Sequence, residues 1–71
     1  MTPEMVPTPE SSSIEEVGYD AEAEEIFVRY KSGGLYAYLG VPAVIWDELR
    51  GAPSTGSFVN QVVKGYPYRQ E

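Results

Sequence analysis

The chain has 71 residues, of which 42% are hydrophobic and 13% aromatic, with no Cys, no His and a formal net charge of −6. This length allows one small domain, and the apolar content is too high for a wholly disordered chain. The missing Cys and His remove disulfides, thiolate metal sites and the most frequent general base. We therefore expect no enzyme, no cofactor and no metal site.

The negative charge is concentrated in the first third of the chain. Residues 1–25 contain eight Asp or Glu and no Lys or Arg, whereas residues 26–71 contain five basic and three acidic residues, a mildly basic balance. No apolar run approaches the ~18 residues of a membrane helix. The chain also lacks the basic-then-hydrophobic order of a signal peptide. We expect a cytoplasmic protein with no membrane partner.

Residues 1–12 are rich in Pro, Ser and Glu, with few apolar side chains. Such a composition cannot bury a face, so we predict a flexible acidic leader followed by one domain over residues 13–71. The alternative is that Met5 and Val6 dock on a partner or on a second copy.

The first predicted strand covers "SIEEVGYD", residues 13–20. Val17 and Tyr19 fall on one face of this strand, whereas Ile14 falls on the other. A β-bulge near Glu15 and Glu16 would place all three apolar side chains on the same face.

The second and third strands form a predicted hairpin. "EIFVRYK", residues 25–31, alternates strictly, and "LYAYLGV", residues 35–41, returns after Gly33-Gly34, a two-residue turn signal. This turn pairs Lys31 with Tyr36 and Arg29 with Tyr38, and it leaves Phe27 opposite Gly40. One face of the hairpin is then aliphatic apart from Tyr30. The other face carries Phe27, Arg29, Lys31, Tyr36 and Tyr38.

Two short helices follow. Pro42 fits a first helical turn, apolar residues at helical spacing come next, and Gly51 ends the helix. Ser54 or Thr55 can cap a second helix. The predicted fold class is α+β, with a three-stranded antiparallel meander followed by two short helices packed on one face of the sheet.

The predicted hairpin face mixes aromatic rings with cations. Single-stranded nucleic acid is bound by rings that stack on bases and by Lys or Arg that meet phosphates. We therefore predict nucleic-acid binding by Phe27, Arg29, Lys31, Tyr36 and Tyr38, with Lys64 extending the positive rim. The alternative is that cross-strand Tyr–Arg and Tyr–Lys pairs only stabilise the sheet, or that the C-terminal "YPYR" covers this face.

A weaker candidate is the "STGS" stretch, which contains Ser54, Thr55, Gly56 and Ser57. Backbone N–H groups at a helix start favour anions. The stretch lacks the lysine and the glycines of a phosphate loop, so helix capping is the simpler interpretation.

The order of these motifs resembles the KTSC domain over about residues 11–69. That family is named for its occurrence at the C-terminus of some lysyl-tRNA synthetases, and it also occurs as a free-standing bacterial or phage protein. The resemblance implies this α+β fold, and RNA binding has been suggested for the family. The matching residues are Tyr36 and Tyr38 of a Tyr-x-Tyr motif, Ser54, Gly56 and Asn60 of a Ser-x-Gly-x-x-x-Asn motif, and the basic Lys64.

We interpret the chain as a small non-catalytic binding module that binds RNA or single-stranded nucleic acid weakly. The alternative is a protein–protein interaction module, such as a phage or bacterial inhibitor or adaptor. In that case the acidic N-terminal third would dock on a basic protein surface.

Overall fold

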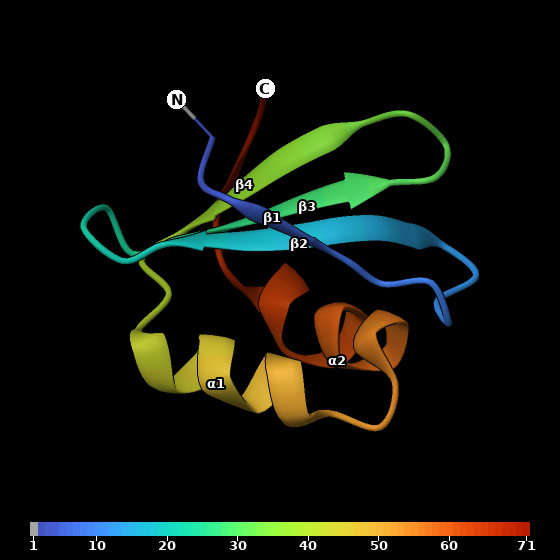
Figure 1. The fold of residues 1–71 in the computed structure, drawn as a ribbon. Helices are drawn as coiled ribbons and strands as arrows, with labels where there is room; N and C mark the ends of the chain where they lie inside the picture. Colours follow the sequence, from blue (N-terminus) through green and yellow to red (C-terminus); the bar gives the residue numbers. More distant parts are fainter. Residues whose placement is uncertain (1) are drawn as a thin grey trace.

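The computed structural model describes residues 2–71. Five strands form one antiparallel sheet in the order β1-β2-β3-β4-β5, and the helices pack on one face of it (Figure 1). The predicted α+β class and the one-sided helices are confirmed, whereas the prediction of three strands is too low. The elements are β1 (Met5–Pro7), β2 (Ile14–Asp20), β3 (Glu25–Tyr30), β4 (Leu35–Leu39), α1 (Ala43–Gly51), α2 (Thr55–Gln61), a 3-10 helix η1 (Val63–Gly65) and β5 (Tyr68–Gln70).

The two additional strands lie at the edges of the sheet. In β1, Met5 pairs with Gly18 of β2, and in β5, Tyr68 pairs with Tyr38 of β4. The strand β1 lies within residues 1–12, the segment predicted to be a flexible leader. The domain boundary after residue 12 stays a prediction.

Gly18 allows the N-terminal segment to lie against the sheet. A Cβ on this glycine would be 2.6 Å from Met5 Sδ and 2.8 Å from the Glu4 carbonyl oxygen. Gly18 pairs with Phe27, and the Phe27 side chain is only 2% exposed. Residues 3–5 thus lie on the face opposite the helices, next to Gly18 and its partner Phe27.

The main core lies between the sheet and the helices. Tyr19 stacks on Trp46 of α1, with ring centroids 5.7 Å apart, and the Tyr19 hydroxyl donates to the Val41 carbonyl at 2.7 Å. Each fully buried aliphatic side chain contributes roughly 1.5–3 kcal/mol. The buried residues of this core are Ile14, Val17, Ile26, Val28, Tyr38, Val41, Leu49, Val59 and Val63.

The β3–β4 hairpin differs from its predicted register. Tyr30 N–H donates to the Gly34 carbonyl and Gly33 N–H donates to the Tyr30 carbonyl, so three residues, not two, form the turn. Of the two glycines, Gly33 has a positive φ of 113°. Tyr36 consequently pairs with Val28 instead of Lys31. A shift by an odd number of residues exchanges the two faces of a strand, so the tyrosines of β4 point to the helix side.

Two local predictions are confirmed. The register shifts between Ile14 and Glu16, which is the predicted bulge and brings Ile14 into the core. Ser54 caps α2, because its side chain accepts a hydrogen bond from Ser57 N–H. Within residues 2–71, neither α1 nor α2 is long and apolar enough to cross a membrane.

Candidate functional site

The predicted aromatic–basic hairpin face does not form. Phe27 is buried, and Arg29 lies on the same outer face of the sheet, where its Nε donates to Glu16 Oε2 at 2.9 Å. Lys31 Nζ donates to the Ser11 carbonyl at 2.6 Å. The structure therefore does not bring these three residues together with the tyrosines of β4.

A different aromatic surface forms on the helix side of the sheet. Four tyrosines from β3, β4 and β5 line a cavity of about 400 Å³, which we call the tyrosine cavity. The Tyr36 ring lies 5.5 Å from the Tyr68 ring and 5.6 Å from the Tyr30 ring, measured between centroids. The residues that line this cavity are Tyr30, Ser32, Tyr36, Tyr38, Lys64 and Tyr68.

The C-terminal tail extends this aromatic surface. Because Tyr68 pairs with Tyr38, its side chain falls on the same face of the sheet, with ring centroids 6.0 Å apart. Tyr68 remains 62% exposed. The tail thus adds an exposed ring at the edge of the tyrosine cavity, beside Tyr38, which is itself only 4% exposed.

The tyrosine cavity has an uncharged wall. The Tyr30 and Tyr38 hydroxyls are 2.8 Å apart. Burial, and then the hydrogen bond with Tyr38, raise the pKa of Tyr30 above its ordinary value, so this phenol keeps its proton to a higher pH than a free tyrosine does. The tyrosine rings of this wall therefore carry no charge at neutral pH.

Lys64 is the cation of this region. Its Nζ lies 5.7 Å from the centroid of the Tyr30 ring. Within residues 2–71, no carboxylate lies within ion-pair distance of Lys64. The other four basic side chains have partners: Arg29 with Glu16, Lys31 with the Ser11 carbonyl, Arg50 with Asp47, and Arg69 with Glu25 and Glu71. Lys64 is thus the basic side chain most available to an anionic ligand.

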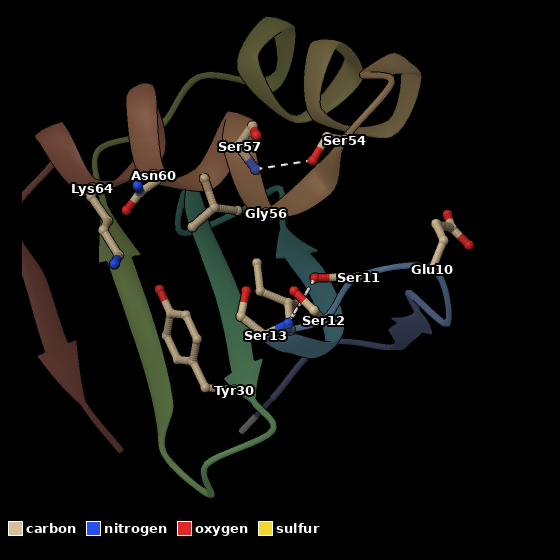
Figure 2. Close-up of a pocket in the computed structure, with 12 residues that line it drawn as sticks. Glu10, Ser11, Ser12, Ser13, Tyr30, Ser54, Gly56, Ser57, Asn60 and Lys64 are labelled. Atoms are coloured by element: carbon tan, nitrogen blue, oxygen red, sulfur yellow. Dashed lines mark hydrogen bonds between the residues drawn. The ribbon is translucent and has the colours of Figure 1, made fainter.

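A second, polar cavity of about 510 Å³ adjoins the first. Residues 10–13 form one of its walls and α2 forms another, and we call it the serine cavity (Figure 2). Tyr30 and Lys64 line both cavities, so the two form one continuous surface. Figure 2 shows the Lys64 side chain directed toward Tyr30 at one end of the serine cavity.

The predicted anion-binding stretch contributes to this cavity. Ser54, Gly56 and Ser57 line it, whereas Thr55 lines a different hollow, next to Leu49 and Arg50. The Ser54 Oγ is used for capping, at 3.3 Å from the Ser57 nitrogen. Capping is therefore the observed role of Ser54, and anion binding by this stretch stays a prediction.

Comparison with known proteins identifies the family. The family model of the KTSC domain matches residues 10–68, which is most of the chain. The chain belongs to the KTSC domain family. The family resemblance inferred from the motifs is thereby confirmed.

Relatives of this KTSC domain occur both alone and within larger proteins. A protein of Tsukamurella paurometabola is 46% identical over 55 residues, covering 78% of this chain and 82% of that protein. A lysine–tRNA ligase of Trichormus variabilis is 35% identical over 63 residues. This match covers 87% of the present chain but only 11% of the ligase.

The fold of this KTSC domain also has a close match among solved structures. A KTSC domain protein from Yersinia pestis superposes with a TM-score of 0.89 and 32% sequence identity, covering 96% of each chain. The likeness therefore extends over nearly the whole of both chains.

The residues that carry the KTSC resemblance gather around the two cavities. The Tyr-x-Tyr motif supplies Tyr36 and Tyr38 to the tyrosine cavity. The motif on α2 lines the serine cavity, and Lys64 lies where the cavities meet. The structure adds Tyr30, Tyr68 and residues 10–13, for which no sequence motif predicts a site.

Proposed function

We propose that this KTSC domain binds single-stranded nucleic acid, with bases on the tyrosine cavity and a phosphate at Lys64. The observation that carries the proposal is the position of Lys64, which has no acidic partner among residues 2–71 and stands over Tyr30 where the two cavities meet. Rings beside an available cation are the elements that bind single strands without reading sequence.

The expected affinity is low. A base stacked on an aromatic side chain contributes roughly 1–3 kcal/mol, so two stacked bases contribute about 2–6 kcal/mol. This is less than the ~8 kcal/mol of a micromolar complex. The net charge of −6 opposes a polyanion, and one lysine offsets it only locally. Binding is therefore best detected at low salt.

The relatives support RNA as the nucleic acid. Three of them are named lysine–tRNA ligases, and a domain like this one makes up about a tenth of each. We infer that the domain contributes binding and no catalysis, because the chain lacks both His and Cys.

Fluorescence anisotropy with a labelled single-stranded RNA, measured over a range of salt concentrations, tests this proposal. Tyr68→Ala removes an exposed ring and should weaken binding about 5-fold or more, the equivalent of 1 kcal/mol. Lys64→Gln should make the slope of log K against log salt concentration less steep by about 0.7. This is the value for the loss of one phosphate contact on a single strand.

Arg50→Gln is the matched control, because it removes the same charge from α1, where Arg50 pairs with Asp47. It should leave the salt dependence unchanged. Absence of RNA binding at low salt, or an equal effect of Lys64→Gln and Arg50→Gln, would contradict the proposal.

The protein-interaction alternative stays a prediction. Part of the acidic third is occupied within the molecule, because Glu16 pairs with Arg29 and Glu25 pairs with Arg69. A pull-down with Glu15→Gln and Glu22→Gln, two exposed positions, tests it. Loss of a protein partner would favour this alternative over the nucleic-acid proposal.

A further inference from the structure

We infer that the serine cavity is a sugar subsite that makes this KTSC domain prefer RNA over DNA. This inference rests on the proposed function. It assigns a part of the bound nucleotide to each cavity. Lys64 takes the phosphate, the tyrosine cavity takes a base and the serine cavity takes the neighbouring ribose.

The charge of the serine cavity favours a sugar over a second phosphate. Its charged residues are Glu10 and Lys64, of opposite sign, and Figure 2 shows them at opposite ends of the cavity. The formal charge of the lining is therefore zero. Since Lys64 is shared with the tyrosine cavity, a second phosphate in the serine cavity would meet no further cation, only the carboxylate of Glu10.

The polar lining matches hydroxyl groups. Within residues 2–71, the hydroxyls of Ser12, Ser13 and Ser57 and the amide of Asn60 make no side-chain hydrogen bond to the protein. Hydroxyl and amide groups both donate and accept, as the ribose 2′-OH does. This hydroxyl is the group by which a protein distinguishes RNA from DNA at a given site.

Gly56 keeps the wall formed by α2 open. A Cβ at this position would lie 3.4 Å from Ser13 Oγ and 3.5 Å from Ser11 Oγ. These are ordinary contact distances, so alanine fits there without displacing the backbone. The added methyl group would nevertheless cover these two hydroxyls and fill part of the cavity.

The test compares a uridine hexamer with a 2′-deoxyuridine hexamer by anisotropy at low salt. The wild-type protein should bind the RNA about 3- to 10-fold more tightly, the ratio that one net hydrogen bond gives. Gly56→Ala should reduce RNA affinity to the level of DNA and leave DNA affinity unchanged. Asn60→Ala, at an exposed position, should also reduce the preference and guards against a folding defect at Gly56.

Gly51→Ala is the matched control. Gly51 is also helical, and a Cβ there would meet nothing within 4 Å, so the sugar preference should be unchanged. Equal binding of both hexamers by the wild type, or a preference that survives both Gly56→Ala and Asn60→Ala, would overturn the sugar subsite and leave the proposed function standing. Failure of both hexamers to bind would overturn the proposed function itself. Competition by inorganic phosphate that Gly56→Ala abolishes would overturn the sugar assignment, because the cavity would then hold an anion.

Discussion

The Tyr30 and Tyr38 hydroxyls are 2.8 Å apart and join neighbouring strands β3 and β4 at the wall of the tyrosine cavity. Tyr38 is 4% exposed, so its hydroxyl depends on Tyr30 for a partner. One of the two hydroxyls must donate its proton to the other. The hydrogen bond is therefore lost if both phenols are ionised.

This pair predicts a loss of stability at alkaline pH. Burial, followed by the hydrogen bond with Tyr38, raises the pKa of Tyr30 above its ordinary value of 10.0. The folded state therefore holds the Tyr30 proton more tightly than the unfolded state does. The stabilisation that comes from the raised pKa of Tyr30 is fully present below pH 10. It is lost progressively as the pH rises above 10. Urea unfolding from pH 8 to pH 11 should show this decline.

Tyr30→Phe provides the comparison. This variant should lose about 1 kcal/mol of the free energy of unfolding at pH 7, because the Tyr38 hydroxyl lacks its partner. Above pH 10 the free energy of unfolding of this variant should fall less steeply than that of the wild type, because phenylalanine has no proton to lose. Parallel alkaline declines of the two proteins would show that Tyr30 ionises as readily when folded as when unfolded.

Gly18→Ala is predicted to displace the N-terminal segment. The new Cβ would lie 2.6 Å from Met5 Sδ and 2.8 Å from the backbone oxygen of Glu4, and the backbone cannot move aside as a flexible side chain can. Overpacking of this kind costs about 1–3 kcal/mol. Thermal unfolding should show the loss, and amide hydrogen exchange of Val6 in β1 should accelerate.

Gly51→Ala is again the control, because nothing lies within 4 Å of its Cβ position. It should match or slightly exceed the wild-type stability, since alanine favours helices by up to ~1 kcal/mol over glycine. A Gly18→Ala protein with wild-type stability and unchanged exchange at Val6 would mean that the segment does not pack on this face.

The elements that the sequence predicts correctly are those with a local pattern. Alternation marks β2 and β3, helical spacing marks α1 and α2, and the mismatch of Ile14 with Val17 indicates the bulge. Strands β1 and β5 have three residues each, too few for a pattern. Their existence depends on pairing with the edges of the sheet, which are formed by residues distant in sequence.

The candidate site was predicted only in part, and the reason is the length of one turn. Two adjacent glycines suggest a two-residue turn, but only Gly33 adopts positive φ, and the additional turn residue reverses the faces of β4. Tyr36, Tyr38 and Lys64 still lie in the candidate site, whereas Phe27 does not. Tyrosine suits both a core and a surface, so the side-chain pattern of β4 alone does not fix which face its tyrosines occupy.

Tyr19→Phe should separate two contacts of one side chain. The phenol donates to the Val41 carbonyl at 2.7 Å, and the ring stacks on Trp46 at an interplanar angle of 14°. Phenylalanine keeps the stack and loses the hydrogen bond, so the free energy of unfolding should fall by about 1 kcal/mol. Tyr19→Leu should lose about 0.5–1.5 kcal/mol more, because the aromatic pair is also lost.

Chemical denaturation followed by Trp46 fluorescence measures both variants. The native emission of Tyr19→Phe should resemble that of the wild type, since the ring beside Trp46 is retained, whereas that of Tyr19→Leu should shift. Equal stability of the two variants would show that the ring stack contributes nothing beyond the hydrogen bond.

Ser11→Ala is predicted to destabilise the wall of the serine cavity. Ser11 is 9% exposed, and its Oγ accepts hydrogen bonds from Ile14 N–H at 3.0 Å and from Ser13 N–H at 3.3 Å. Alanine leaves both donors without this acceptor, and Ile14 is 1% exposed, so water reaches its N–H poorly. An unsatisfied buried donor costs about 1–3 kcal/mol, which urea unfolding should reveal.

Ser12→Ala is the matched control, because Ser12 is exposed and makes no side-chain hydrogen bond within the part of the chain described, residues 2–71. Its free energy of unfolding should stay within about 0.5 kcal/mol of the wild type. If Ser11→Ala is equally neutral, water replaces the lost acceptor and this wall is open to solvent. If only Ser11→Ala loses stability, the loop is held in place by the hydrogen bonds that Ser11 Oγ accepts.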